Sequence, residues 1–210
     1  MPFSIKFVSL WRQKKIKMEN EQRYSPEDFQ EALSVLRSGG VLLYPTDTIW
    51  GIGCDATNEQ AVKRIYSIKR RAENKSMLVL LDAIGKLQGY VSDVPAIAYD
   101  LLDCATRPTT IIYPRARNLA SNLIAEDGSI GIRITTERFT RSLISALHHP
   151  IVSTSANLSG EPAPKFFHQI SPEILSAVDY VVKYRQEDTT EHQPSSIIQL
   201  WDGGRFKIIR

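Results

Sequence analysis

A run of cations in the first half of the chain is suited to binding phosphate. Lys69, Arg70, Arg71 and Lys75 supply four positive charges within seven residues, just before an apolar run that begins at Met77. Guanidinium groups hold phosphate oxygens in pairs, and a lysine ammonium acts as a compact point charge. Cations are also favoured at the solvated C-terminus of a helix by the helix dipole. Because the run leads straight into a core strand, we expect it to hold phosphates in the mouth of a cleft.

Two other segments are rich in small hydrogen-bonding side chains. Residues 44–48 read Tyr-Pro-Thr-Asp-Thr, and residues 153–160 read Ser-Thr-Ser-Ala-Asn-Leu-Ser-Gly. Hydroxyl, amide and backbone N–H groups at this density suit the binding of carboxylate or phosphate oxygens. Arg133 stands inside an otherwise apolar strand, where it lies either on a solvated face or opposite an anion. The sequence leaves both alternatives open.

Residues 51–56, Gly-Ile-Gly-Cys-Asp-Ala, match a relaxed dinucleotide-binding pattern. In that motif the glycines follow a strand at once, whereas residues 45–50 intervene here. We therefore interpret the glycines as part of a bent strand near a ligand. The sequence contains no Walker A motif, no Gly-x-Ser-x-Gly motif and no kinase signature.

Capping signals and apolar periodicity predict the elements that position these segments. Helices are expected after Ser25, from Thr57 to about Ile68, over 95–104, over 137–148 and after Ser171. Alternation of helices and strands, followed by a closing hairpin at 202–204, predicts a single α/β domain with a mixed sheet. The expected strands are 41–44, 77–81, 109–113, 129–134, 151–153, 180–182, 196–200 and 206–209.

The composition is that of a folded domain, with 210 residues of which 42% are hydrophobic and 23% charged. The net charge is +3, but five cations precede the first acid, Glu19, so that subtracting them leaves −2 for the remainder. A net charge of −2 does not indicate a broad positive surface that would bind nucleic acid. Residues 1–18 are expected to be a basic extension, either disordered or a start-site artefact, with the folded domain over 19–210. A transit peptide is the alternative.

Cysteine and histidine spacing excludes two classes of site. Cys54 and Cys104 lie fifty positions apart, and the four histidines show no metal-ligand spacing. We therefore expect neither a disulfide framework nor a structural zinc site, and a reducing, cytoplasmic location. No membrane association is expected, because the longest apolar run, 77–81, is far shorter than the about 18 residues that a spanning helix needs.

Five segments in order resemble the YrdC-like threonylcarbamoyl-AMP synthase family: YPTDTIWGIGCDA, KRRAENKSM, GIRI, STSANLSGEP and PSSII. The resemblance covers residues 25–210. It implies a mixed, twisted sheet flanked by helices around a concave, cation-lined cleft. It also implies a reaction in which L-threonine, bicarbonate and ATP give threonylcarbamoyl-AMP and pyrophosphate. The product is the activated donor for the threonylcarbamoyladenosine modification of tRNA.

The resemblance also implies which residues bind each substrate. Threonine is expected at Thr48, Arg133, Ser153, Ser195 and Ser196. Mg²⁺ is expected to arrive with ATP rather than at a protein-built metal site, and Asp47 is the one carboxylate to test as a metal or amine contact. The nucleotide and its phosphates are expected at Lys69, Arg71, Lys75, Ser129, Ser155, Asn157 and Arg210, with Lys69 and Arg71 as the catalytic cations.

The chain departs from the family pattern in ways that bear on selectivity. Ala72 and Ser76 remove two prolines from the cationic loop, so that it loses two fixed φ angles. Leu80 replaces a histidine, Trp50 replaces a tyrosine, and 105–107 replaces a Trp-Pro-Gly segment. A different carbamoyl-adenylate is therefore an alternative product.

Two further expectations concern macromolecules. A non-catalytic module that binds double-stranded RNA or tRNA is the alternative from another functional class. Its binding would fall steeply with salt, whereas synthesis of an adenylate would not depend on RNA. The chain resembles the short form of the family, which passes its product to separate partner proteins of the tRNA threonylcarbamoyl-transfer machinery.

Overall fold

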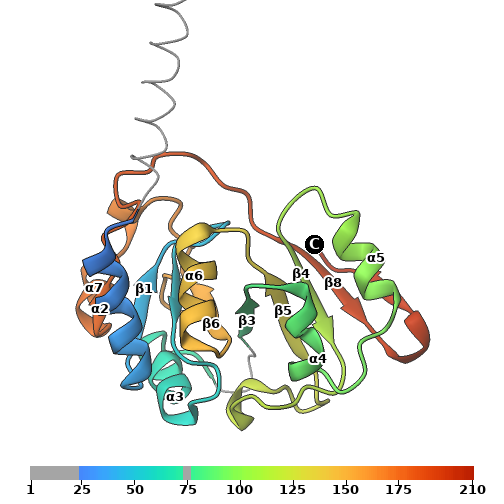
Figure 1. Ribbon diagram of the computed structural model, residues 1–210. Coiled ribbons are helices and arrows are strands. Elements are labelled where there is room, and N and C mark those ends of the chain that lie inside the picture. The colour runs from blue at the N-terminus through green and yellow to red at the C-terminus, as the bar shows by residue number, and fades with distance from the viewer. Residues whose placement is uncertain (1–23, 73–76) are drawn as a thin grey trace, which may run out of the picture.

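Residues 24–72 and 77–210, which the computed structural model describes, contain nine strands that pair into one mixed sheet (Figure 1). Three neighbouring pairs run parallel and the other five run antiparallel. The expected mixed-sheet α/β architecture is therefore confirmed. In spatial order the strands are β7 (Tyr180–Val181), β1 (Leu42–Tyr44), β2 (Gly51–Gly53), β6 (Ile151–Ser155), β3 (Leu78–Leu81), β5 (Ile130–Ile134), β4 (Thr109–Tyr113), β8 (Ser196–Leu200) and β9 (Phe206–Ile208).

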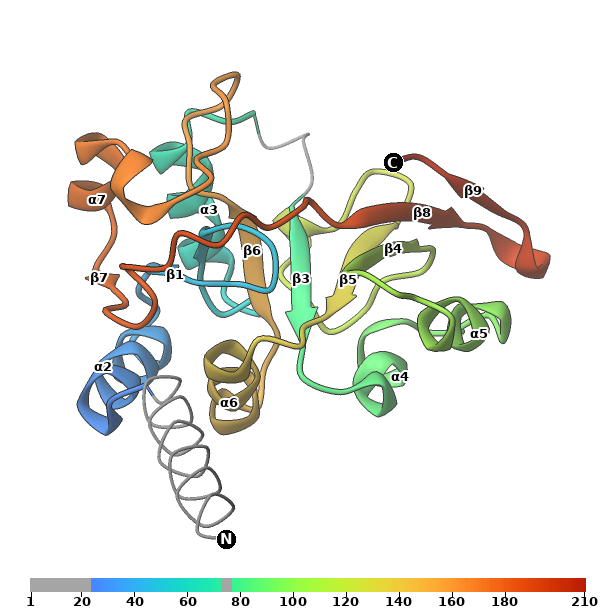
Figure 2. The same ribbon diagram turned by 90° about the horizontal axis from the view of Figure 1, so that it is seen from above.

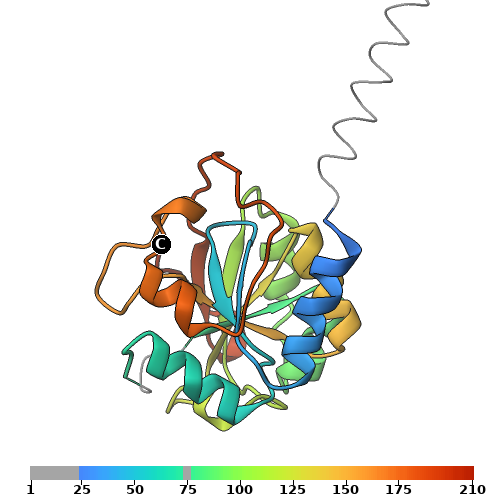
Figure 3. The ribbon, with the colours of Figure 1, turned by 90° about the vertical axis from the view of Figure 1, so that its left-hand side faces the viewer.

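Helices flank this sheet on both sides (Figure 2). In the described part of the chain they are α2 (Pro26–Arg37), α3 (Glu59–Ile68), α4 (Leu87–Tyr90), α5 (Ile97–Asp103), α6 (Arg138–Leu147) and α7 (Pro172–Ala177). Helices α2 and α6 pack side by side (Figure 3), and α3 and α7 lie across the sheet from them. None of the helices in the described residues is long and apolar enough to cross a membrane.

Most helices begin where the capping signals predict. The Ser25 hydroxyl accepts a hydrogen bond from the Asp28 N–H at 3.0 Å, and Pro26 opens α2. Asn58 caps α3 and Ser171 caps α7 in the same way. These side chains satisfy backbone donors that have no partner inside the helix. Side-chain hydrogen bonds within a few residues therefore determine where these helices begin.

Two apolar clusters hold the helices against the sheet. One lies between α2 and α6 and the strands beneath them, where Leu33, Leu36, Phe139 and Leu143 are buried. The larger cluster joins α3, α4 and α5 to the sheet. Burial of such side chains stabilises a fold by about 1.5–3 kcal/mol each. The two clusters together make the sheet a rigid platform for the loops at its edge.

The structure corrects several details of the predicted elements. Residues 51–53 form an interior strand, β2, which was not among the predicted strands but agrees with the interpretation of its glycines as strand residues rather than a dinucleotide-binding motif. Helix α4 was not predicted, and β6 runs two residues further than expected, to Ser155. In α3, Tyr66 is buried, and Ile68 is partly buried and packs against the core. Residues 1–18 lie outside the described residues.

Candidate active site

A cavity of about 290 Å³ opens at the ends of β2, β3 and β6 and receives side chains from distant parts of the chain. Arg71 follows α3, Arg133 lies on β5, and Arg210 is the last residue. Three guanidinium groups around one cavity favour a polyanionic ligand. The structure thereby brings together seven of the residues expected to bind substrates: Thr48, Arg71, Arg133, Ser153, Ser155, Ser195 and Arg210.

Arg133 is held by a buried ion pair. Its Nη2 lies 3.0 Å from Oδ1 of Asp47, and the two side chains are only 4% and 5% exposed. The other Asp47 oxygen accepts a hydrogen bond from the Thr136 N–H at 3.3 Å. Among the described residues, Nε of Arg133 has no hydrogen-bond partner. Arg133 is therefore not on a solvated face, and it retains a buried donor that an anionic ligand can satisfy.

Sheet register places Arg133 among hydroxyl groups. It lies opposite Thr110 of β4, and the Thr110 hydroxyl is 3.0 Å from the hydroxyl of Ser195. On the other side of the cavity, the Thr48 hydroxyl lies 3.0 Å from that of Thr46. Hydroxyl groups both donate and accept, so these pairs can turn toward a bound polar group. The sequence did not assign a role to Thr46 or Thr110.

Lys69 does not line the cavity, in contrast to the expected phosphate contact. The residue is 1% exposed, and its Nζ donates to the backbone carbonyls of Ser155 and Asn157. In return, the Ser159 N–H donates to the Lys69 carbonyl at 2.8 Å. Burial, assisted by the charge of Arg71, lowers the pKa of Lys69 to about 8. Lys69 therefore anchors the loop that follows β6.

The other cations of the run separate in space. Arg70 forms an exposed ion pair with Glu173 of α7, so it supports the surface rather than the cavity. Arg71, the next residue, lines the cavity. Lys75 lies outside the described residues. Of the predicted run, the structure thus places one residue, Arg71, at the cavity wall.

Three more of the expected contacts lie outside the cavity wall. Ser129 precedes β5, and its N–H donates to Asp127. Asn157 donates to the carbonyls of Leu158 and Glu161, and its Oδ1 is buried without a partner in the described part of the chain. Ser196 pairs with Thr109 in the sheet. The structure leaves the roles of Ser129, Asn157 and Ser196 as predictions.

The departures from the family pattern fall in different environments. Trp50 lines the cavity and lies against Phe167, with ring centroids 4.9 Å apart. Leu80 is fully buried in the cluster under α6, so it does not reach the cavity. Residues 105–107 form an exposed turn before β4. Trp50 is therefore the departure best placed to affect selectivity.

Acidic groups near the cavity are few. No group of three or more His, Cys, Asp and Glu side chains suited to a metal ion occurs in the described residues. Asp47, the carboxylate singled out from the sequence, is paired with Arg133. Its charge is thereby used to hold a cation in place.

The chain is similar to known proteins over most of its length. Residues 34–210 match the model of the Sua5/YciO/YrdC family, which is described as "Telomere recombination". A Xanthomonas euvesicatoria protein named threonylcarbamoyl-AMP synthase is 35% identical over 159 residues, which is 74% of this chain and 84% of that protein.

Two solved structures share the fold. One is P. abyssi Sua5 complexed with L-threonine, with a TM-score of 0.78 and 23% identity. The match covers 90% of this chain and 55% of Sua5, so the chain spans little more than half of that longer protein. The other is E. coli YciO, with a TM-score of 0.76, 23% identity, and coverage of 89% of this chain and 91% of YciO.

Proposed function

The chain belongs to the Sua5/YciO/YrdC family, and from this premise we propose that it is an L-threonylcarbamoyladenylate synthase. The enzyme joins L-threonine, bicarbonate and ATP into threonylcarbamoyl-AMP, with release of pyrophosphate and water. One observation carries the proposal beyond the family relationship: three arginines, among them the buried Arg133, and several hydroxyl groups converge on one cavity.

Threonine occupies the part of the cavity around Arg133. Its carboxylate pairs with the guanidinium, which Asp47 orients from behind. Its hydroxyl and amine meet the hydroxyl groups of Thr48, Ser153 and Ser195. The expected contact from Ser196 stays part of this proposal as a prediction.

ATP occupies the part of the cavity around Arg71, Ser155 and Arg210. Arg71 offsets charge on the phosphates. Lys69 acts indirectly, because its ammonium holds the backbone of the loop at Ser155 and Asn157. Lys75, Ser129 and Asn157 keep their expected nucleotide contacts as predictions. Mg²⁺ comes bound to the ATP phosphates, where it neutralises charge during transfer.

The reaction needs positioning more than covalent help. The threonine amine combines with bicarbonate to form a carbamate with loss of water. A carbamate oxygen then attacks the α-phosphorus in line, and pyrophosphate leaves. Holding the carbamate beside the α-phosphate converts a bimolecular step into an effectively unimolecular one. Arg71 and Arg210 stabilise the charge that develops on the phosphates.

The product has to be consumed by a separate activity, because an acyl adenylate is an activated donor. We therefore include in the proposal the transfer to tRNA by partner proteins, and a binding assay with tRNA tests direct contact. The two cysteines of the chain are free, which suits the reducing cytoplasm in which such a transfer takes place.

The test is a mass-spectrometric search for threonylcarbamoyl-AMP after incubation of the protein with ATP, Mg²⁺, bicarbonate and L-threonine. Product that requires all four components supports the proposal. Formation of an adenylate with serine but not threonine would assign another carbamoyl-adenylate. Folded protein that binds RNA in a salt-dependent manner, but not ATP, would replace the enzyme with an RNA-binding module.

A further inference from the structure

A strap of chain, residues 185–194, crosses the sheet beside the candidate active site. It leaves β7 and runs to β8, passing across β1, β6 and β3 in the view of Figure 2. Its far end enters the cavity through Pro194 and Ser195. The strap therefore connects the outer side of the molecule to one wall of the site.

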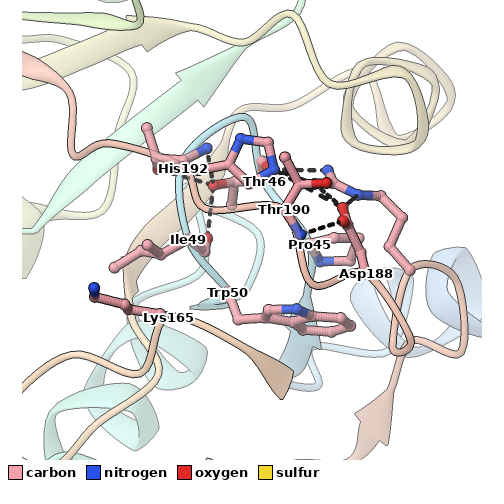
Figure 4. A pocket seen from close by; sticks show the side chains of 10 residues that line it. Pro45, Thr46, Ile49, Trp50, Lys165, Asp188, Thr190 and His192 are labelled. Carbon is pink, nitrogen blue, oxygen red and sulfur yellow. Dashed lines mark hydrogen bonds and ion pairs between the residues drawn. The ribbon is translucent and has the colours of Figure 1, made fainter. Parts of the chain in front are cut away.

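Arg185 at the start of the strap makes hydrogen bonds with three residues in two segments. Its Nη1 donates to the Thr46 carbonyl at 3.1 Å. Its Nε and Nη2 donate to Oδ2 of Asp188 at 2.9 and 2.8 Å, and Nη2 also donates to Nε2 of His192 at 3.0 Å. Figure 4 shows Thr46, Asp188 and His192 around the small cavity that they share with Trp50. One guanidinium thus ties the strap to itself and to the loop 45–50.

The surroundings of Arg185 are acidic and partly buried. The side chain is 21% exposed, and Nη1 lies 4.0 Å from Oε1 of Glu137, the residue that caps α6. Burial opposes ionisation of Asp188, but hydrogen bonds from Thr190 and Arg185 hold its pKa at about 2. Charge-assisted hydrogen bonds in such surroundings are stronger than neutral ones.

The backbone of Arg185 is in the left-handed region, with φ at 65°. A residue other than glycine or asparagine adopts this conformation at a cost of about 1–2 kcal/mol. The contacts of the guanidinium offset this cost. Strained residues of this kind persist where the surrounding structure fixes them, and they cluster near functional sites.

Two segments lead from Arg185 to the cavity: the loop 45–50, which Arg185 contacts directly, and the strap, whose far end Arg210 holds. Thr46 is fixed to Thr48, because the Thr48 N–H donates to the Thr46 hydroxyl at 3.0 Å. The other end of the strap is held by Arg210, whose Nε donates to the Ser195 carbonyl at 3.1 Å. Thr48 and Ser195 therefore lie on two segments that Arg185 joins.

We propose that Arg185 is a positioning residue for the amino-acid substrate: by clamping the strap to the loop 45–50, it sets the placement of Thr48 and Ser195 across the cavity. The effect on threonine rests on the function proposed above. Arg185 makes no hydrogen bond to a residue that is expected to bind the nucleotide. Its loss therefore weakens the binding of threonine more than the binding of ATP.

Two variants distinguish the contribution of the Arg185 guanidinium from those of its backbone conformation and its positive charge. Arg185→Asn tolerates the left-handed conformation but removes the guanidinium. Arg185→Lys keeps the charge but cannot bridge Thr46 and Asp188 with a planar fork. Lys183→Met is the matched control. Lys183 and Arg185 both line a second, outer cavity beside the strap, and the Lys183 ammonium makes no ion pair or hydrogen bond with the described residues.

The first readout is steady-state kinetics of adenylate formation. We expect both Arg185 variants to raise KM for threonine about tenfold or more, with kcat and KM for ATP within about threefold of wild type. The Lys183→Met control keeps the wild-type values. An unchanged KM for threonine overturns the inference, and so does an equal rise in both KM values, which would indicate a general structural role.

The second readout does not depend on the reaction. Amide hydrogen exchange over residues 187–195 is expected to be about tenfold faster in Arg185→Asn than in wild type and Lys183→Met. Unchanged exchange overturns the clamp even if the enzyme is active. If wild-type protein makes no adenylate while the strap exchanges faster in Arg185→Asn, the clamp stands and the proposed function fails.

Discussion

Asp47 and Arg133 form an ion pair across the back of the cavity, at 3.0 Å and with both side chains at least 95% buried. The two residues lie 86 positions apart, in the loop before β2 and near the end of β5. A buried carboxylate compensates the desolvation of the guanidinium and fixes its direction. The pair therefore accounts for an arginine in the interior of the sheet.

We expect Asp47→Asn to weaken threonine binding more than ATP binding. The substitution leaves Arg133 buried without its counter-charge and free to change orientation. KM for threonine should rise at least about tenfold, and the free energy of unfolding should fall by about 2–3 kcal/mol. Steady-state kinetics and urea denaturation measure the two effects. Asp188→Asn, which disturbs the strap but not the pair, is the control for stability; an unaltered KM for threonine in Asp47→Asn would refute the assigned role of Arg133.

Adjacent arginines provide a test of the phosphate contact. Arg71 lines the cavity, whereas Arg70 forms an exposed ion pair with Glu173. Arg71→Ala should lower kcat/KM for ATP about a hundredfold or more, because it removes a cation from the developing phosphate charge. Arg70→Ala should stay within about twofold, since an exposed pair contributes little. Equal effects of the two substitutions would contradict the assignment.

Local signals in the sequence predicted much of the fold. Ser25 and Ser171 cap helices as expected, because capping depends on residues a few positions apart, whereas α3 is capped by Asn58, one residue after the expected start. Helix α6 also lies within the expected segment 137–148. Such features follow from chemistry that is contained in one short segment.

Features that depend on distant segments could not be predicted. The burial of Lys69 arises because the loop after β6 folds over it, and the cationic run by itself favours a solvated helix end. The glycines of β2 were interpreted as strand residues, but the close packing between β1 and β6 that requires a glycine at Gly53 depends on sheet register. The pairing of Asp47 with Arg133 likewise follows from sheet register. The resemblance to the family predicted most of the residues that line the cavity, but not the contacts that hold those residues in place.

Gly53 tests the interpretation of the glycine pattern. A Cβ at this position would lie 2.1 Å from the Val152 carbonyl oxygen and 2.7 Å from Cε1 of Tyr44. Gly53→Ala should therefore lower the free energy of unfolding by about 3 kcal/mol or prevent folding, because backbone must move in the centre of the sheet. Gly89→Ala is the control, since no atom lies within 4 Å of its added Cβ. Thermal unfolding compares them, and equal stability of the two variants would show that Gly53 is not required for packing.

The lowered pKa of Lys69 predicts how stability depends on pH. Burial lowers this pKa to about 8 in the folded protein, from 10.5 as the ordinary value. Between these values the unfolded chain binds more protons, so stability rises with pH through this window. The neutral amine retains two N–H donors for the carbonyls of Ser155 and Asn157, so the loop keeps its anchor.

Lys69→Met isolates this contribution, because tyrosines that titrate at high pH affect both proteins alike. Between pH 8 and 9.5, wild type should gain about 1–2 kcal/mol of unfolding free energy relative to Lys69→Met. Urea denaturation at several pH values measures the difference. A constant difference across the window would mean that Lys69 titrates normally, and hence that its ammonium is hydrated rather than enclosed by the loop. That outcome would contradict the anchoring role, so the pH series tests the role itself.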